Sequence, residues 1–334
     1  MKKTYYLFNP GILSRKDNTL KFSQKDKDGI VQNTRYLPIE NVDELYVFGS
    51  LDANSALYNF LGKQNIPIHF FDYYENYTGS FMPKDNLLSG KLLMAQARKH
   101  DNKKERLKLA KLILDGGVHN MIKNLSYYDK RGKDLLPLIK IMKKFHSEFD
   151  KANDIEYLMG LEGNIRKTYY EGFELIINDF SMGGRSMQPP LNEVNALISF
   201  GNMMCYSECL RSIHQTQLNP VISFLHSPGE RRYSLSLDLA EVFKPILVDR
   251  VIFKVLNKKI LKEEDFDVLV NKVILKPKGK MKFVKAYEDR LSETINHRNL
   301  NRSVSYKYLI RLECYKLIKH MLDIEQYKPL KMWW

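Results

Sequence analysis

Hydrophobic and polar positions follow two different patterns along this chain, and the pattern changes near Pro83. Before that point, short segments rich in β-branched and aromatic residues alternate with turn residues, as in β-strands. Beyond it, apolar residues recur three and four positions apart, as in amphipathic helices. The sequence therefore predicts an α+β fold, in which a small β-rich N-terminal domain over residues 1–83 precedes a larger, mostly α-helical C-terminal domain over 84–334.

The N-terminal pattern predicts strands grouped around a single helix. The first strand is closed by the turn residues Asn9-Pro10-Gly11, and a helix is expected where apolar residues of 55–63 share one side. The expected strands are 3–8, 19–23, 34–39, 44–49 and 66–71.

The C-terminal pattern predicts a series of long helices and one short β element. The predicted helical segments are 88–113, 135–149, 154–177, 191–213, a segment that bears Asp238 and Glu241 and runs on through Lys254, and 305–323. The first of them has a polar interruption at 102–106. A β-hairpin is predicted near 273–284, because turn residues separate two short apolar runs. The six lysines from Lys272 to Lys285 fit either a solvated hairpin or contact with phosphates.

Composition and charge narrow the class of protein. A hydrophobic content of 44% supports a packed core, and the formal net charge of +14 favours polyanionic partners, although lysine-rich usage explains it too. The three cysteines make no disulfide framework, and the pair Cys205 and Cys209 is expected to be buried packing. No signal peptide and no membrane-length apolar run is seen, so we expect a cytoplasmic protein without a membrane partner.

Candidate chemistry gathers in one segment of the C-terminal half. Asp238 and Glu241 are three apart, so on a helix they share a face, and that face carries apolar residues. Buried carboxylates are costly unless a positive charge lies between them, which a divalent metal would supply. His226 comes shortly before this helix, at the end of an apolar run, and is a candidate third ligand.

A further carboxylate, Glu162, lies on the apolar stripe of the helix predicted at 154–177. An ion pair with a nearby arginine explains such a position as well as a metal does. One imidazole with two or three carboxylates suits Mg²⁺ or Mn²⁺ better than Zn²⁺, and no nucleotide-binding, zinc-protease or serine-hydrolase motif is present. Basic residues flank these acids in the sequence, which favours a phosphodiester substrate: Arg166, Lys167, Arg231, Arg232, Lys244 and Arg250.

Around the candidate site residues Glu162, His226, Asp238 and Glu241, the chain resembles members of a known family. This is the family of the CRISPR-associated integrase, the first-numbered Cas protein. The resemblance covers nearly the whole chain and is carried most specifically by Phe224-Leu225-His226 and by the run from Ser234 to Pro245. Weaker blocks follow the same order, namely 37–42, 49–54, 162–170, 192–201 and 248–250. Ser223 and Lys244 depart from residues common in the family, glycine and arginine, and the overall character resembles the type I-B branch.

The resemblance implies a role for each of these residues. Glu162, His226 and Glu241 are the implied metal ligands, Asp238 is an accessory acid, and Arg166, Arg231, Arg232 and Lys244 are expected to position DNA. It also implies homodimerisation through the N-terminal domain and a complex with a small partner, the second-numbered Cas protein. Prespacer DNA and the CRISPR leader-repeat are the implied double-stranded substrates.

Three hypotheses about function follow from these features. The first is a metal-dependent integrase and endonuclease of CRISPR adaptation, which joins prespacer 3′-hydroxyl ends to the repeat by transesterification. The second keeps the same site but uses water as the nucleophile, which makes a stand-alone, structure-specific DNA nuclease. The third is a non-catalytic, basic DNA-binding scaffold, whose acids form structural ion pairs.

Overall fold

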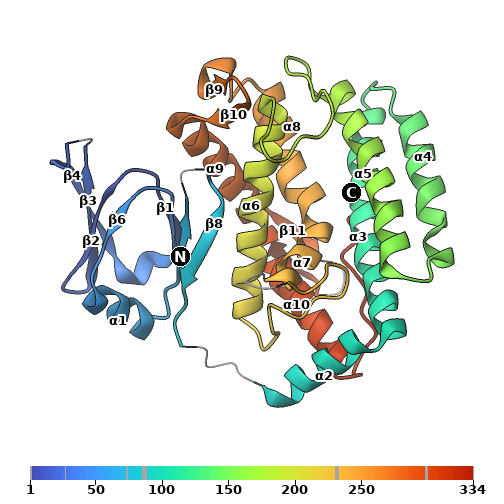
Figure 1. Cartoon of the computed structure of the whole chain (residues 1–334), viewed down its shortest axis with the longest axis horizontal. Coiled ribbons are helices and arrows are strands. Elements are labelled where there is room, and N and C mark those ends of the chain that lie inside the picture. Colours follow the sequence, from blue (N-terminus) through green and yellow to red (C-terminus); the bar gives the residue numbers. More distant parts are fainter. Residues whose placement is uncertain are drawn as a thin grey trace. The chain divides into compact units, whose positions relative to one another are not determined.

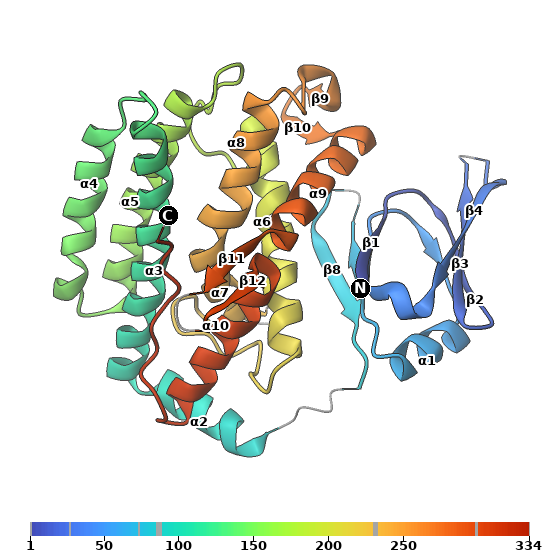
Figure 2. The same cartoon turned by 180° about the vertical axis from the view of Figure 1, so that it is seen from behind.

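The chain forms two compact units, Met1–Asn86 and Leu87–Trp334, shown from two sides in Figures 1 and 2. The structure is a computed structural model that describes residues 2–26, 28–72, 74–84, 89–229, 233–297 and 300–333. The N-terminal unit is rich in strands and the C-terminal unit is mostly helical, so the predicted α+β fold class is confirmed.

Among the described residues, the N-terminal unit contains two four-stranded sheets, one α-helix and one short 3₁₀ helix. In the first sheet, β1, β5 and β7 run parallel and β8 pairs antiparallel with β7. In the second, β2, β3 and β4 form an antiparallel meander, and β6 pairs with β2. The elements are β1 (Lys3–Leu7), β2 (Gly11–Lys16), β3 (Thr19–Lys25), β4 (Val31–Pro38), η1 (Ile39–Asn41), β5 (Val42–Val47), β6 (Leu51–Asp52), α1 (Ser55–Lys63), β7 (Ile68–Phe71) and β8 (Tyr77–Phe81).

The core of this unit forms where alternate strand residues turn inward. Leu13, Leu20 and Leu45 are buried on the strands, and Leu57 and Leu61 of α1 pack in the same cluster. The helix begins at Asn54, whose side chain accepts a hydrogen bond from the Leu57 amide at 3.0 Å. The strands β2, β6 and β8 were not predicted. β2 begins at Gly11, which the sequence assigned to a turn, β6 has only two residues, and Gly79 interrupts the apolar alternation of β8.

The C-terminal unit is built from packed helices. The helices α3, α4 and α5 lie side by side (Figure 1), and α7 packs between α3 and α6. The helices are α2 (Gly90–Asp101), α3 (Lys103–Asp129), α4 (Leu136–Ser147), α5 (Ile155–Ile176), α6 (Glu193–His214), α7 (Ser234–Lys244), α8 (Arg250–Asn257), α9 (Pro277–Ser292) and α10 (Tyr306–Met321). Short elements complete the unit: η2 (Phe149–Lys151), η3 (Pro245–Asp249), η4 (Glu263–Asp265), β9 (Phe266–Leu269), β10 (Lys272–Leu275), β11 (Thr294–His297) and β12 (Arg302–Ser305).

The segment from α7 through η3 to α8 forms the centre of this unit. Most of its residues are buried, including the acidic side chains of Asp238, Glu241 and Asp249. The turn η3 is π-helical and begins at Pro245, which cannot donate the regular α-helical hydrogen bond. Helical structure therefore continues from Ser234 to Asn257, as the pattern predicts through Lys254.

The hairpin predicted near 273–284 is wrong. Its first strand exists as β10, but β10 pairs with the preceding strand β9, and the chain from Pro277 to Ser292 is the helix α9. Pro277 occupies the first turn of that helix, where proline is favoured, and Phe283, Tyr287 and Leu291 recur every four residues as its buried side. The turn signal therefore marks the start of a helix.

Candidate active site

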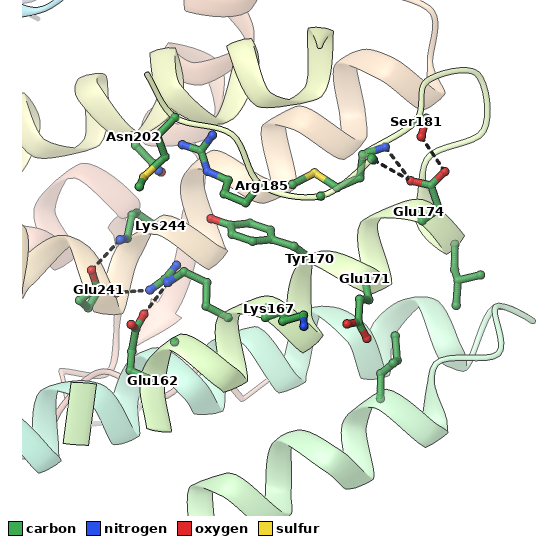
Figure 3. Close-up of a pocket in the computed structure, with 18 of the residues that line it drawn as sticks. Glu162, Lys167, Tyr170, Glu171, Glu174, Ser181, Arg185, Asn202, Glu241 and Lys244 are labelled. Carbon is green, nitrogen blue, oxygen red and sulfur yellow. Dashed lines mark hydrogen bonds and ion pairs between the residues drawn. The ribbon is translucent and has the colours of Figure 1, made fainter. Parts of the chain in front are cut away.

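The three predicted metal ligands line one cleft of the C-terminal unit. The cleft has a volume of about 1220 Å³, and Glu162, His226 and Glu241 all belong to its lining. Figure 3 shows Glu162 and Glu241 next to each other in this cleft, on the two helices α5 and α7. Residues far apart in the sequence therefore meet at one place.

The two carboxylates are joined by the guanidinium of Arg166. Its Nε donates to Oε1 of Glu162 at 2.5 Å, and its Nη2 donates to Oε2 of Glu241. Arg166 follows Glu162 by one helical turn on α5, so this part of the arrangement is an i,i+4 pair. The ion pair with a nearby arginine, one of the two explanations for Glu162, is therefore present in the structure.

Glu241 has a second cationic partner, Lys244, one turn later on α7. The Nζ of Lys244 donates to Oε1 of Glu241 at 2.6 Å, and both side chains are largely buried. Burial raises the pKa of Glu241, but the charges of Arg166 and Lys244 outweigh it and hold this pKa at about 2. Glu241 is therefore ionised and fully engaged by positive groups.

His226 is held by Asp238, which itself does not line the cleft. The ring Nδ1 of His226 lies 2.9 Å from Oδ1 of Asp238, and that oxygen also accepts the His226 amide at 3.0 Å. The other oxygen of Asp238 accepts the amides of Phe224 and Leu225 at 2.6 and 3.0 Å. Asp238 is fully buried, so it fixes both the backbone and the ring of the segment that carries His226.

The helix α3 packs closely against α7 and fixes the position of α7 in the unit. A Cβ atom at Gly117 would lie 2.7 Å from the backbone oxygen of Glu241, so only glycine allows this packing. One turn away on α3, Asn120 donates from Nδ2 to the backbone oxygen of Val242 at 2.9 Å. The position of Glu241 thus depends on α3, which carries none of the predicted site residues.

The loop between α5 and α6 contributes residues to the cleft. The sequence did not predict a functional role for them. Met182, Arg185 and Met187 line the cleft from this loop, and Tyr170 lines it from α5. The buried side chain of Asn195 holds the loop: Oδ1 accepts the Ser186 amide at 2.9 Å, and Nδ2 donates to the backbone oxygen of Gly184 at 2.8 Å. The glycines and prolines of 183–190 indicated only an exposed loop.

Two of the four predicted DNA-binding residues can be placed. Arg166 and Lys244 line the cleft, but both are paired with carboxylates there. Arg231 and Arg232 lie outside the described residues. The DNA-binding role of all four residues stays a prediction.

The donor set of the cleft suits a hard divalent cation. Within the ranges that the structure describes, no three His, Cys, Asp or Glu side chains converge closely enough to hold an ion. The carboxylates of Glu162 and Glu241 nevertheless meet at a single positive group, and His226 belongs to the same cleft. Two carboxylates and one imidazole are ligands that Mn²⁺ accepts and that Mg²⁺ accepts in part.

The cysteines and the helix lengths agree with the expectations from sequence. Cys205, Cys209 and Cys314 are free and buried. Among the described helices, none combines the length and the apolar character needed to cross a bilayer.

Comparisons with known proteins identify one family. A family model described as CRISPR associated protein Cas1 matches residues 5–289. A CRISPR-associated endonuclease Cas1 of Fusobacterium nucleatum is 44% identical over 100% of this chain and 98% of its own length. The structure of a Cas1 protein from Thermotoga maritima superposes with a TM-score of 0.85 at 36% identity, covering 99% of this chain and 100% of that one. A casposase bound to its integration product has the same fold, with a TM-score of 0.86 at 19% identity, covering 100% of this chain and 95% of that one.

Proposed function

Because this chain belongs to the CRISPR-associated Cas1 family, we propose that it is a metal-dependent DNA integrase and endonuclease of CRISPR adaptation. The reaction is a transesterification at a phosphodiester of the CRISPR repeat. The 3′-hydroxyl of a prespacer end attacks the phosphorus, a new P–O bond forms, and the bond to the repeat 3′-oxygen breaks. The attacking hydroxyl loses a proton and the leaving 3′-oxygen gains one, so no external energy source is needed.

The residues of the cleft divide this work among them. Glu162, His226 and Glu241 would hold Mg²⁺ or Mn²⁺, which when bound supplies Lewis-acid stabilisation of the phosphate oxygens. Asp238 orients the His226 ring through Nδ1 and leaves Nε2 as the ligand atom. The basic residues neutralise the DNA backbone, and Arg166 and Lys244 do so from inside the cleft.

One observation carries this proposal: Glu162 and Glu241, from helices that are distant in sequence, meet with His226 at a single cleft. The net charge of +14 supports a nucleic-acid substrate. The fold shared with a casposase bound to its integration product supports DNA joining as the class of reaction.

The partners follow from the family. We propose that the protein acts on double-stranded prespacer and leader-repeat DNA in the cytoplasm, without a membrane partner. We further propose a homodimer formed through the N-terminal unit and a complex with the second-numbered Cas protein. Assignment to the type I-B branch stays a prediction from sequence.

The test compares two carboxylates of the same cleft. Glu162→Gln removes a proposed ligand, whereas Glu171→Gln removes an exposed cleft carboxylate for which no ligand role is proposed. We expect Glu162→Gln to lose strand transfer roughly a hundredfold or more with DNA binding retained, and Glu171→Gln to keep most of the activity. Equal joining by wild type and Glu162→Gln would refute the assignment of Glu162. DNA binding by the wild type without any metal-dependent joining or cleavage would favour a scaffold whose acids serve in ion pairs.

A stand-alone nuclease is the second candidate, because the Fusobacterium nucleatum relative is named an endonuclease. The two activities differ only in the nucleophile, which is water in one case and a DNA hydroxyl in the other. Incubation with a supercoiled CRISPR plasmid and a labelled prespacer, with and without the second-numbered Cas protein, separates them. Label joined to the plasmid indicates integration, whereas nicking without joining indicates the nuclease.

A further inference from the structure

Arg166 is the positive group that lies between the two carboxylates of the cleft. Its guanidinium contacts Oε1 of Glu162 and Oε2 of Glu241, and Oε1 of Glu241 contacts Lys244. Both oxygens of Glu241 and one oxygen of Glu162 are therefore already bound to cations that belong to the chain itself. These are the oxygens that a divalent ion would need.

The charges of this group balance without an ion. Two carboxylates face one guanidinium and one ammonium, and the side chains of Glu162, Glu241 and Arg166 are only 13%, 6% and 18% exposed. Solvent screens charges weakly at such exposure, so an added divalent ion would be repelled by a guanidinium that stayed in place. Ion binding and the Arg166 contacts are therefore mutually unfavourable.

We propose that Arg166 competes with the divalent ion for Glu162 and Glu241, so that the ion binds only when the guanidinium leaves these carboxylates. This inference rests on the proposed function, because it takes Glu162 and Glu241 as metal ligands. In the absence of the ion, Arg166 compensates the charge of the two carboxylates and holds α5 to α7 through side-chain contacts. Arg166 is thus a positioning residue that exchanges partners.

The released guanidinium remains in the cleft, where a DNA phosphate gives it a new partner. A guanidinium binds phosphate with two parallel hydrogen bonds, a geometry that the ammonium of lysine lacks. DNA therefore lowers the cost of removing Arg166 from the carboxylates, and the ion lowers the cost of pairing Arg166 with DNA. The two ligands are expected to bind cooperatively, each raising the affinity for the other by the same factor.

The test measures Mn²⁺ affinity rather than activity, by electron paramagnetic resonance of free Mn²⁺ titrated into the full chain. Arg166→Gln removes the competitor, and Lys167→Gln removes the neighbouring charge of the same cleft as a matched control. We expect Arg166→Gln to bind Mn²⁺ about tenfold more tightly than wild type, and Lys167→Gln to differ by no more than about twofold. A short double-stranded oligonucleotide should raise the Mn²⁺ affinity of the wild type and raise that of Arg166→Gln less.

Three outcomes would overturn the inference. Equal tightening in Arg166→Gln and Lys167→Gln would indicate general electrostatics, weaker binding in Arg166→Gln would indicate that Arg166 organises the ligands, and unchanged affinity would indicate no competition. If Arg166→Gln does not fold, Arg166→Lys takes its place, because it keeps the charge but is too short to contact both carboxylates. Its Mn²⁺ affinity should still exceed that of the wild type, and an unchanged affinity would count against competition.

Glu241→Gln separates this inference from the proposed function. If Glu241→Gln binds Mn²⁺ as well as the wild type does, the proposed metal site is wrong. If Glu241→Gln loses Mn²⁺ while Arg166→Gln matches the wild type, the metal site stands and only the competition is wrong.

Discussion

The imidazole of His226 and the buried carboxylate of Asp238 form one unit, with Nδ1 and Oδ1 2.9 Å apart. Asp238 also accepts the backbone amides of Phe224, Leu225 and His226, so one side chain fixes the ring and the segment that carries it. The sequence predicts two acids on one helix face, and the structure gives them different surroundings. Glu241 faces the cleft, whereas Asp238 lies behind His226.

Asp238→Asn should therefore weaken metal binding through His226. The amide nitrogen of asparagine would face N–H donors where the carboxylate accepts them, leaving buried groups unpaired at about 1–3 kcal/mol. We expect a lower melting temperature and a Mn²⁺ affinity reduced about 10–100-fold. Ser236→Ala is the control, since its buried hydroxyl bonds only locally to the Tyr233 backbone at 2.8 Å. Wild-type Mn²⁺ affinity in Asp238→Asn would contradict the positioning role.

Gly117 allows the close packing of α3 against α7. A substitution at Gly117 should therefore disturb the site without contacting any carboxylate or imidazole of the site. In Gly117→Ala the new methyl group would lie 2.7 Å from the Glu241 backbone oxygen, so α3 and α7 must separate. We expect unfolding to become easier by about 1–3 kcal/mol and strand transfer to fall. Urea denaturation and a strand-transfer assay measure the two effects.

Gly160→Ala is the matched control, because it lies within α5 with nothing within 4 Å of the added Cβ. Alanine there should stabilise the helix by up to about 1 kcal/mol and leave strand transfer unchanged. If the two alanine variants behaved alike, close helix packing at Gly117 would not explain the position of Glu241.

The sequence predicts most of the fold, because long periodic segments determine helices strongly. The helices α4, α5, α6 and α10 match their predicted ranges closely, and Asn102 ends α2 and caps α3 within the predicted polar interruption. Local turn residues carry less information, as the segment after Lys276 demonstrates. Lys-Pro-Lys-Gly is compatible with a hairpin turn and with a helix start, and only tertiary packing of Phe283 and Tyr287 decides between them.

The sequence also predicts which residues meet at the cleft, but not how they are partnered. Glu162 and Arg166 are one helical turn apart, so their pair is visible from spacing. The pair of Arg166 with Glu241 spans 75 positions, and only the packing of α5 near α7 creates it. The role of Glu162, His226 and Glu241 as metal ligands stays a prediction.

Asn195 should control the wall of the cleft rather than its metal ligands. Its side chain joins the loop to α6 through the Ser186 amide and the backbone oxygens of Met182 and Gly184. Asn195→Asp keeps the acceptor but places an oxygen against two carbonyls, which costs about 1–3 kcal/mol. We expect weaker binding of double-stranded DNA and an unchanged Mn²⁺ affinity, measured by fluorescence anisotropy and by Mn²⁺ titration. Weakened Mn²⁺ binding would place Asn195 in the metal site instead.

Asp249 should make the stability of the C-terminal unit depend on pH. This carboxyl is buried and accepts a hydrogen bond from Tyr169 at 2.9 Å. Burial raises its pKa to about 7, against the lowering effects of Tyr169, Arg166 and Lys244 and with a smaller raising effect of Glu241. The ordinary pKa of an aspartate is 3.8, so between these values the folded chain holds a proton that the unfolded chain has lost.

Stability from this group is therefore complete below about pH 4 and is lost as the pH rises towards 7. Asp249→Asn keeps an acceptor for Tyr169 and removes the titration. Relative to wild type, the variant should gain roughly 2–3 kcal/mol of stability between pH 5 and pH 8. Urea denaturation of both proteins at these two pH values measures the difference. The Tyr169→Phe variant tests the assignment further, because it removes the hydrogen bond that favours the ionised carboxyl. Its loss of stability should therefore extend to higher pH than in the wild type. A stability difference between wild type and Asp249→Asn that is the same at both pH values would show that Asp249 is ionised in the folded chain throughout this range, and would contradict the raised pKa.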